Sequence, residues 1–250
     1  MLRVCLTSGC KGGTGKSTIS ILLTVLYAGV GKRVILVDTG VQGNSSHMIL
    51  SAPPPPYLRD VLHKGSITEA ILKCEVALKD RNLSFYLIPN NGDLQGISIG
   101  IVEKAFKKIE NFFDIAILDI PAYQNGEYNL FIDVCDIAIL VYNPNSIAIR
   151  SVSKAYVGKC RIIPLLNKDL GIEKYRSLVG EFHDKYLVMP FDPYLPLLSP
   201  ENLTTVLLNL SRKTQESLVE LALEILKPKS SSKKSRISKN LFKIGTILRR

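Results

Sequence analysis

Residues 10–18, CKGGTGKST, have the residue types and the spacing of a phosphate-binding loop. The ending Gly15-Lys16-Ser17 follows further glycines, which allow successive backbone N–H groups to point at phosphate oxygens. We expect Lys16 to reach the β- and γ-phosphates of a nucleotide and the Ser17 hydroxyl to bind Mg²⁺. The residues predicted to contact the nucleotide in this loop are Cys10, Lys11, Gly12, Gly13, Thr14, Gly15, Lys16, Ser17 and Thr18.

Apolar runs and helical patterns alternate along the chain around this loop. Uninterrupted runs of Ile, Val and Leu are typical of strands that are covered on both faces, as in a parallel sheet. A helix is predicted at residues 18–28 and another at 101–113, where Ile101, Ala105, Ile109 and Phe112 form an apolar stripe. The alternation predicts an α/β fold with a doubly wound, mostly parallel sheet and helices on both faces. Strands are expected at residues 2–8, 33–38, 83–89, 114–120, 136–142, 161–166 and 186–189.

Two segments do not follow this alternation. Four consecutive prolines at residues 53–56 predict a stiff exposed connector, because proline fits neither a helix interior nor an inner strand. Residues 227–240 are rich in Ser and Lys and predict a mobile linker. We therefore expect one nucleotide-binding domain at residues 1–226, followed by a basic tail at 227–250.

Composition and charge limit the class of protein further. The 250 residues are 46% apolar, which is enough to build a large buried core. The net charge is +10, and nine basic residues with no acidic residue follow from position 227, which leaves +1 for the rest of the chain. Five cysteines without a C-x-x-C pair indicate reduced thiols and a cytoplasmic protein. No apolar run approaches the roughly 20 residues of a membrane-spanning helix.

The string KGGTGKST, residues 11–18, resembles the deviant Walker A motif of the ParA/MinD family of P-loop ATPases. In that family the first lysine reaches across a nucleotide-sandwich dimer to phosphates held by the partner subunit. The resemblance implies this role for Lys11 and implies that the catalytic groups are Lys11, Lys16 and Asp38. It also implies ATP and Mg²⁺ as ligands, an ATP-dependent homodimer and an activating partner protein.

The resemblance extends to the segments that flank the nucleotide in the family. Residues 34–46, VILVDTGVQGNSS, look like its second strand and switch I, and residues 112–122, FFDIAILDIPA, look like Walker B and switch II. These matches imply that Ser17, Asp38 and Asp119 surround the Mg²⁺. A carboxylate at the end of an apolar strand suits a metal-bound water. The alternative for Asp119 is a cap of the helix that follows.

Two later segments resemble the adenine side of the family's site. LLNK at residues 165–168 implies that Asn167 bonds the adenine amino group and a ring nitrogen, although a turn asparagine is the alternative. MPFD at residues 189–192 implies adenine-side contacts from Pro190 and Asp192. A guanine-reading N-K-x-D motif is disfavoured, because Leu170 stands where its aspartate would be.

Switch I departs from the family pattern at one position. The family usually carries two carboxylates there, as D-x-D, and the second orients the attacking water. This chain has Asp38-Thr39-Gly40, so the second carboxylate is replaced by a residue without a side chain. Loss of a water-positioning group lowers turnover by about a hundredfold, or about 3 kcal/mol of barrier. We therefore expect nucleotide binding with hydrolysis that is slow or depends on a partner.

The end of the tail, residues 238–250, has the pattern of a basic amphipathic helix. Ile237, Leu241, Ile244 and Leu248 fall on one line, and basic residues project from the opposite side. Such a helix binds anionic membranes, as it does in some MinD-type proteins. DNA phosphates are an alternative ligand for the nine cations. Two further alternatives are that the helix docks on a protein partner and that the tail is simply disordered.

Three functions follow from these patterns. The first is a ParA/MinD-like ATPase that dimerises on ATP, binds DNA or the inner face of the membrane, and positions plasmid, chromosome or other cargo. The second is a nucleotide-gated binding module with little turnover, for which Gly40 is the argument. The third is a metabolic ATP-dependent enzyme, for which the sequence offers no second substrate site.

Overall fold

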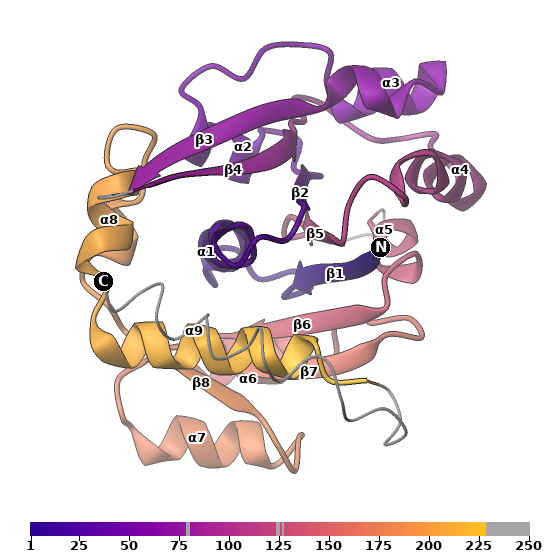
Figure 1. Ribbon diagram of the computed structural model, residues 1–250. Coiled ribbons are helices and arrows are strands. Elements are labelled where there is room, and N and C mark those ends of the chain that lie inside the picture. The colour runs from indigo at the N-terminus through magenta and orange to yellow at the C-terminus, as the bar shows by residue number, and fades with distance from the viewer. Residues whose placement is uncertain (79–80, 124–125, 127, 229–250) are drawn as a thin grey trace.

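A single mixed sheet forms the centre of the computed structural model, which describes residues 1–78, 81–123, 126 and 128–228 (Figure 1). Within this part of the chain the sheet has eight strands in the order β3-β4-β2-β5-β1-β6-β7-β8. Every neighbouring pair is parallel except β3 and β4. The predicted α/β fold with a mostly parallel sheet is therefore confirmed. The strands are β1 (Leu2–Thr7), β2 (Val34–Asp38), β3 (Leu72–Leu78), β4 (Arg81–Ile88), β5 (Ile115–Asp119), β6 (Ile137–Tyr142), β7 (Arg161–Asp169) and β8 (Leu187–Pro190).

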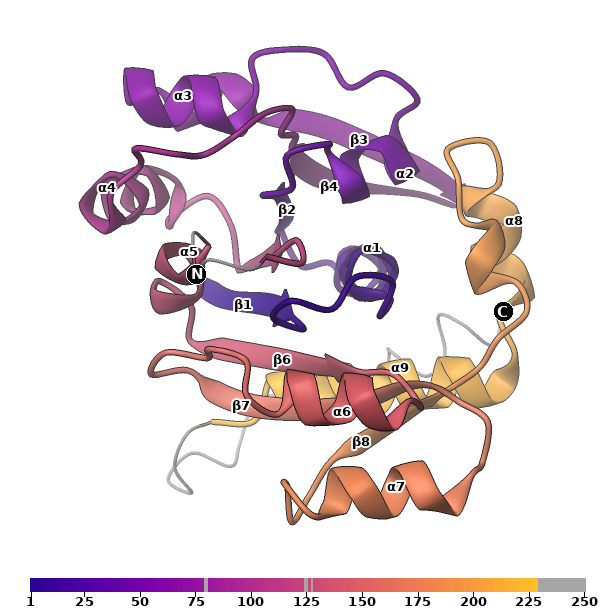
Figure 2. The ribbon, with the colours of Figure 1, turned by 180° about the vertical axis from the view of Figure 1, so that it is seen from behind.

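Helices cover both faces of the sheet, as the two opposite views show (Figure 1, Figure 2). One face carries α1 (Lys16–Gly29), α2 (Asn44–Ile49), α8 (Leu203–Asn209) and α9 (Arg212–Ile225). The other face carries α3 (Leu58–Lys64), α4 (Ile99–Ile109), α5 (Asn129–Asp133), α6 (Ser146–Val152) and α7 (Glu173–Gly180). Short 3₁₀ turns are η1 (Ile67–Ala70) and η2 (Leu195–Leu197).

The central strands owe their place to their uninterrupted apolar sequences. All residues of β2, β5 and β6 are buried, because each strand is covered by helices on both faces. Neighbouring residues of one strand enter different cores, since side chains alternate between the faces. In β1, Val4 and Leu6 pack toward α1, whereas Cys5 packs in the core beneath α4 and α5.

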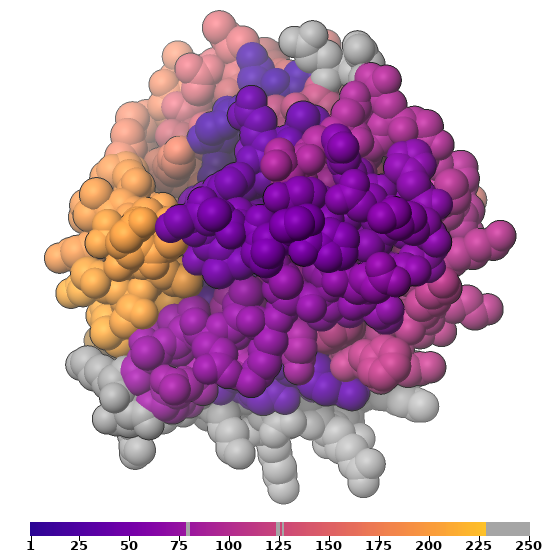
Figure 3. Space-filling model, turned by 90° about the horizontal axis from the view of Figure 1, so that it is seen from above, coloured from indigo at the N-terminus to yellow at the C-terminus, as the bar shows by residue number. Residues whose placement is uncertain are grey.

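The sequence analysis predicted no strand at residues 72–78 and so missed the antiparallel edge strand β3. The chain reaches this strand through α3 and η1. The strand shows strict alternation, with Cys74 and Val76 buried and Lys73 and Glu75 exposed, which is the pattern of a half-buried strand. Seen from above, the purple segment that includes α2, α3 and β3 covers this end of the molecule, beside the orange α8 (Figure 3).

The predicted stripe on the helix at residues 101–113 was wrong at its end. Helix α4 stops at Ile109, so Phe112 lies beyond it and is 60% exposed. Val102 and Phe106 are buried together with Ala105 and Ile109 instead.

The predicted proline connector is exposed at Pro54 and Pro55, whereas Pro53 is buried. The prediction of a basic tail at residues 227–250, including the helix at 238–250, lies outside the described residues from position 229 on.

The parallel arrangement brings the ends of β1, β2, β5, β6 and β7 to one edge of the sheet. The chain leaves β1 through α1 toward β2 on one side of the sheet, whereas it leaves the neighbouring β6 through α6 toward β7 on the other side, so a crevice opens beyond the carboxyl end of β1. The glycine-rich loop follows β1 directly and joins it to α1. Among the described residues, no helix has both the length and the apolar content to span a membrane.

Candidate functional site

The loop between β1 and α1 wraps around the start of α1. Gly13 and Gly15 have left-handed backbone angles, with φ of 69° and 94°. A side chain at Gly15 would place its Cβ only 2.3 Å from the Asn167 amide nitrogen. Glycine is therefore required there both by the left-handed backbone and by the lack of space. Helix α1 starts at Lys16, and the positive end of its backbone dipole therefore faces the inside of the loop.

Three side chains from neighbouring strands hold the carbonyl groups of this loop. The Lys168 ammonium donates to the Gly13 carbonyl at 2.8 Å, and the Asn143 amide donates to the same oxygen at 3.3 Å. The Asn167 amide donates to the Thr14 carbonyl at 2.7 Å. Because these carbonyls are bonded away from the loop's centre, its N–H groups remain available to an anion.

An irregularity in β7 allows both Asn167 and Lys168 to reach the loop. The pairing of β7 with β8 shifts between Leu166 and Asp169, and Lys168 has a left-handed φ of 58°. In a regular strand, two successive side chains would point to opposite faces. The sequence analysis named Asn167 but missed Lys168 and Asn143. The pair Asn-Lys directly after an apolar strand was the available signal for Lys168.

Lys16 is 6% exposed and lies inside the loop. Its ammonium donates to the Ser8 hydroxyl at 2.9 Å and to the Lys11 carbonyl at 3.4 Å. Burial lowers the pKa of Lys16, and the nearby Asp119 carboxylate acts against this change. The ammonium therefore lies in a poorly solvated place, where an incoming phosphate would replace two neutral acceptors with charged ones.

Lys11 differs from Lys16 in its surroundings. Its backbone closes the loop by donating to the Ser8 carbonyl at 3.1 Å. Its side chain is half-buried and makes no hydrogen bond or ion pair within the part of the chain that the structure describes. Cys10, Gly12 and Gly13 beside it are exposed. The structure thus leaves Lys11 free to contact a group from outside, and its predicted role in a dimer stays a prediction.

Two buried carboxylates lie side by side below the loop. Asp38 and Asp119 end the adjacent strands β2 and β5 and are paired in register. Both oxygens of Asp119 are buried without a hydrogen bond to any described residue. Burial, followed by the Asp38 charge, raises the pKa of Asp119 to about 7, although Ser17, Lys16 and Ser45 oppose the rise. An unpartnered buried carboxylate beside a hydroxyl is suited to a cation and its water.

Asp38 already has a full set of partners. It accepts hydrogen bonds from the Gly40 N–H at 2.8 Å and from the N–H and hydroxyl of Ser46 at 2.8 and 2.7 Å. Burial raises the pKa of Asp38, and these bonds act against the rise. Asp38 therefore orders the turn after β2, and it could reach a metal only through a change in that turn.

The residues at this place fit a Mg²⁺ ion. Ser17 and Asp119 offer oxygen atoms, and the remaining positions would come from phosphate oxygens and water. No group of three His, Cys, Asp or Glu side chains suited to a metal occurs in the described ranges, so the ion would depend on the nucleotide for part of its ligands.

A small cavity of about 100 Å³ opens between the loop and the ends of β7 and β8, where the sequence predicts the adenine. Asn167 borders it, and the Asn167 carbonyl oxygen is buried without a hydrogen bond from a residue that the structure describes, which leaves it free to accept from an adenine amino group. Phe191, which the sequence analysis missed, is 47% exposed there and offers a ring for stacking. The lining residues are Gly15, Thr18, Ile19, Asn167, Lys168, Pro190, Phe191, Asp192, Leu195 and Pro196.

Asp192 borders this cavity but its carboxylate is used elsewhere. It accepts from the N–H groups of Tyr194 at 3.0 Å and Ser211 at 2.8 Å, which connects η2 to the start of α9. Burial acts to raise its pKa, but the hydrogen bonds from Thr214, Ser211 and Tyr194 leave the pKa lowered. The predicted contact of Asp192 with the nucleotide therefore stays a prediction, and its visible role is to shape the wall.

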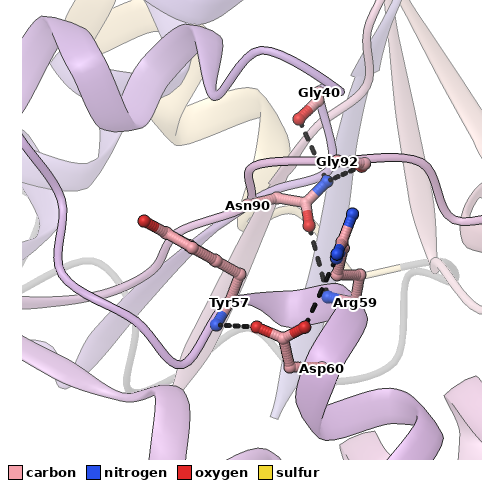
Figure 4. A network of polar contacts seen from close by, with 6 residues as sticks. All are labelled: Gly40, Tyr57, Arg59, Asp60, Asn90 and Gly92. Carbon is pink, nitrogen blue, oxygen red and sulfur yellow. Dashed lines mark hydrogen bonds and ion pairs between the residues drawn. The ribbon is translucent and has the colours of Figure 1, made fainter.

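The turn after β2 is held by both backbone polar groups of Gly40, and Figure 4 shows the bond to its carbonyl. The Gly40 N–H donates to Asp38, and its carbonyl accepts from the Asn90 amide at 3.0 Å. A Cβ at position 40 would lie 3.1 Å from the nearer Asp38 oxygen and 3.2 Å from the amide of the exposed Asn44. A side chain there is tight, because a rotation of Asn44 relieves only the second of these two contacts.

Comparisons with known proteins agree with this arrangement. A family model described as an AAA domain matches residues 3–172. The septum site-determining protein MinD of Bacillus subtilis is 29% identical over 186 residues, which cover 72% of this chain and 65% of that protein. The chromosome partitioning protein ParA of Caulobacter vibrioides is 35% identical over 107 residues, covering 42% of this chain and 38% of the other.

A solved structure of MinD from Pyrococcus horikoshii, complexed with Mg-ADP, superposes with a TM-score of 0.72 at 23% identity. It covers 90% of this chain and 96% of that one. This likeness supports the fold alone. The chain spans about half to two thirds of the length of the first curated relatives it matches.

Replacement of Lys168 tests the role of the loop's carbonyl contacts. Lys168→Met removes the charged donor to the Gly13 carbonyl, and a partly exposed bond of this kind contributes about 1 kcal/mol. We expect nucleotide affinity to fall about fivefold to tenfold in equilibrium titrations. Lys174→Met, at an exposed position of α7, is the matched control. Equal affinities for the two variants would contradict this role.

The raised pKa of Asp119 predicts a pH-dependent stability of the nucleotide-free protein. The pKa rises from an ordinary value of 3.8 to about 7 in the folded protein, so ionisation opposes folding, and stability is lost as the pH rises from about 4 to 7. Asp119→Asn cannot ionise, and above pH 7 we expect its free energy of unfolding to exceed that of the wild type by on the order of 1–4 kcal/mol. Urea titrations should show this gain shrinking toward pH 5. A pH-independent gain, or the same gain for exposed Asp184→Asn, would contradict it.

Proposed function

Because this chain belongs to the ParA/MinD family of P-loop ATPases, we propose that it binds ATP and Mg²⁺ at the β1–α1 loop. We further propose that ATP joins two copies face to face and that this dimer binds an anionic surface. The observation that carries the proposal is the loop whose Gly13 and Thr14 carbonyls accept from side chains outside it, beside the unpartnered Asp119 carboxylate. The family predicted from residues 11–18 is confirmed, while the surface and the cargo stay proposals.

The roles of the site residues follow from their surroundings. The N–H groups of the loop and the Lys16 ammonium bind the phosphates, and Asn167 and Phe191 receive the adenine. Ser17 and Asp119 hold the Mg²⁺. When bound, Mg²⁺ neutralises charge on the β- and γ-phosphates and makes the terminal phosphorus a better target for water. Lys16 adds positive charge where negative charge develops during transfer.

Hydrolysis by this site is expected to be slow without help. Gly40 has no side chain that could orient water, and both oxygens of Asp38 are bonded to the turn that contains Gly40. An activating partner would supply or reposition the missing group. A nucleotide-gated binding module that hardly turns over is the second candidate function, and the same bonded turn favours it.

The bound surface is proposed from the sequence of the tail. Its nine cations favour contact with DNA phosphates or anionic lipid headgroups, and residues 229–250 lie outside the described structure. Through such contacts the protein would position cargo on the nucleoid or at the inner face of the membrane. Truncation after Leu226 separates binding by the tail from binding by the folded domain.

Lys11 should be required for the ATP-dependent dimer. We expect the wild type to be dimeric with Mg-ATP and monomeric with Mg-ADP or without nucleotide in light-scattering measurements of molar mass. Lys11→Ala should remain monomeric with Mg-ATP, because the partner's phosphates lose a cation. Lys104→Ala, on an exposed face of α4, should dimerise like the wild type. A wild type that stays monomeric with Mg-ATP would remove the sandwich model.

Gly40→Asp should raise the rate of ATP hydrolysis. The new carboxylate stands where a water-positioning group is missing, so we expect turnover to rise at least about tenfold in steady-state phosphate release. Asn44→Asp adds a carboxylate nearby, at the first residue of α2, and serves as the control. Fast wild-type hydrolysis that the Gly40→Asp substitution does not improve would contradict the proposed defect.

A further inference from the structure

A single buried amide connects the turn after β2 to two other segments (Figure 4). Asn90 follows β4 and is 1% exposed. Its nitrogen donates to the carbonyls of Gly40 at 3.0 Å and Gly92 at 2.9 Å, and its oxygen accepts from the Arg59 N–H at 3.2 Å. Both donor hydrogens and one acceptor site of the side chain are thus used by backbone groups.

Asn90 touches the turn at two points. Besides the bond to Gly40, its backbone carbonyl lies against Gly43, where an added Cβ would be 2.6 Å from the Asn90 oxygen. Gly43 has a left-handed φ of 63° and precedes α2. The span from Gly40 to Gly43 is therefore held against the loop after β4 by one hydrogen bond and one close packing contact.

The same loop also fixes the beginning of α3. The Leu58 N–H donates to the Pro89 carbonyl at 2.8 Å, next to the bond between Arg59 and Asn90. Asp60 accepts from the Tyr57 N–H at 3.0 Å and completes the helix start. The first N–H groups of a helix have no partner within the helix, and in α3 the loop after β4 provides acceptors for two of these groups.

We propose that Asn90 is a positioning residue of the nucleotide site, which holds the Gly40 turn in place and couples it to α3. This inference rests on the proposed function, since it concerns how that site is regulated. Asn90 does not touch the nucleotide in this role. It acts through Gly40, whose N–H bonds Asp38, so that the buried carboxylate, the turn and the outer helix move together.

The chemistry of the amide explains why asparagine suits the position. Two carbonyls and one N–H meet at this point, and an amide provides two donors together with an acceptor. An ionised aspartate of the same shape keeps the acceptor for Arg59 but has no hydrogen to donate to Gly40 or Gly92. The neighbouring Asn91 is exposed, which makes it a matched control for the same substitution.

The test compares Asn90→Asp and Asn90→Ala with Asn91→Asp and Asn91→Ala in the full chain. Amide hydrogen exchange is followed without nucleotide, affinities are measured for Mg-ATP and Mg-ADP, and turnover is measured as steady-state phosphate release with Mg-ATP. Both Asn90 variants should exchange about tenfold faster at residues 39–46, because the turn opens more readily, while β1 and α9 keep their wild-type rates. Mg-ADP affinity should stay within about twofold, while turnover with Mg-ATP changes. Both Asn91 variants should match the wild type.

Unchanged exchange at residues 39–46 in both Asn90 variants would overturn the proposal. Faster exchange throughout the domain, with equal losses of ATP and ADP affinity, would reduce Asn90 to a general stabilising residue and would also overturn it. If exchange rises only at residues 39–46 while the wild type itself binds no ATP, Asn90 does hold the turn and the proposed function fails instead. The exchange readout thus separates the two failures.

Discussion

The backbone of the β1–α1 loop imposes the constraint on which the rest of the site depends. A peptide group that points its N–H at a phosphate must point its carbonyl in nearly the opposite direction. The buried Thr14 carbonyl in particular needs a donor, since a buried unpaired carbonyl costs about 1–3 kcal/mol. Lys168, Asn143 and Asn167 provide the donors from the ends of β6 and β7. The parallel order of β1, β6 and β7 is therefore a condition for phosphate binding as well as for packing.

Charge in the site is balanced for a ligand that carries both a cation and an anion. Lys16 lies inside the loop with neutral acceptors, while Asp119 lies below it with no hydrogen bond from the described part of the chain. Burial disfavours the charged form of each, so the pKa of Lys16 is lowered and that of Asp119 is raised. A magnesium nucleotide satisfies both groups together, because its phosphates meet the ammonium and its metal meets the carboxylate.

The turn after β2 is where this chain differs from the family pattern. Gly40 offers no side chain, yet its N–H donates to Asp38 and its carbonyl accepts from Asn90. Its backbone is thus ordered although the water-positioning group is missing. Under the proposed function, an ordered turn without the second carboxylate favours slow hydrolysis of the bound nucleotide. The connection to α3 also offers a route by which contacts on the outer surface could act on turnover.

The sequence by itself determined the local features, because glycine spacing and apolar periodicity are properties of short segments. It predicted the strands of the parallel sheet, the loop with Lys16 and Ser17, and the carboxylates Asp38 and Asp119 at the strand ends. It missed β3, although apolar and polar residues alternate from Leu72 to Val76, and it placed Phe112 on a helix that ends at Ile109. Only the tertiary structure revealed the contacts of Lys168, Asn143 and Asn90 with carbonyls of other loops. These contacts join residues that are between 50 and 155 positions apart, and their existence depends on strand order and on the irregularity in β7.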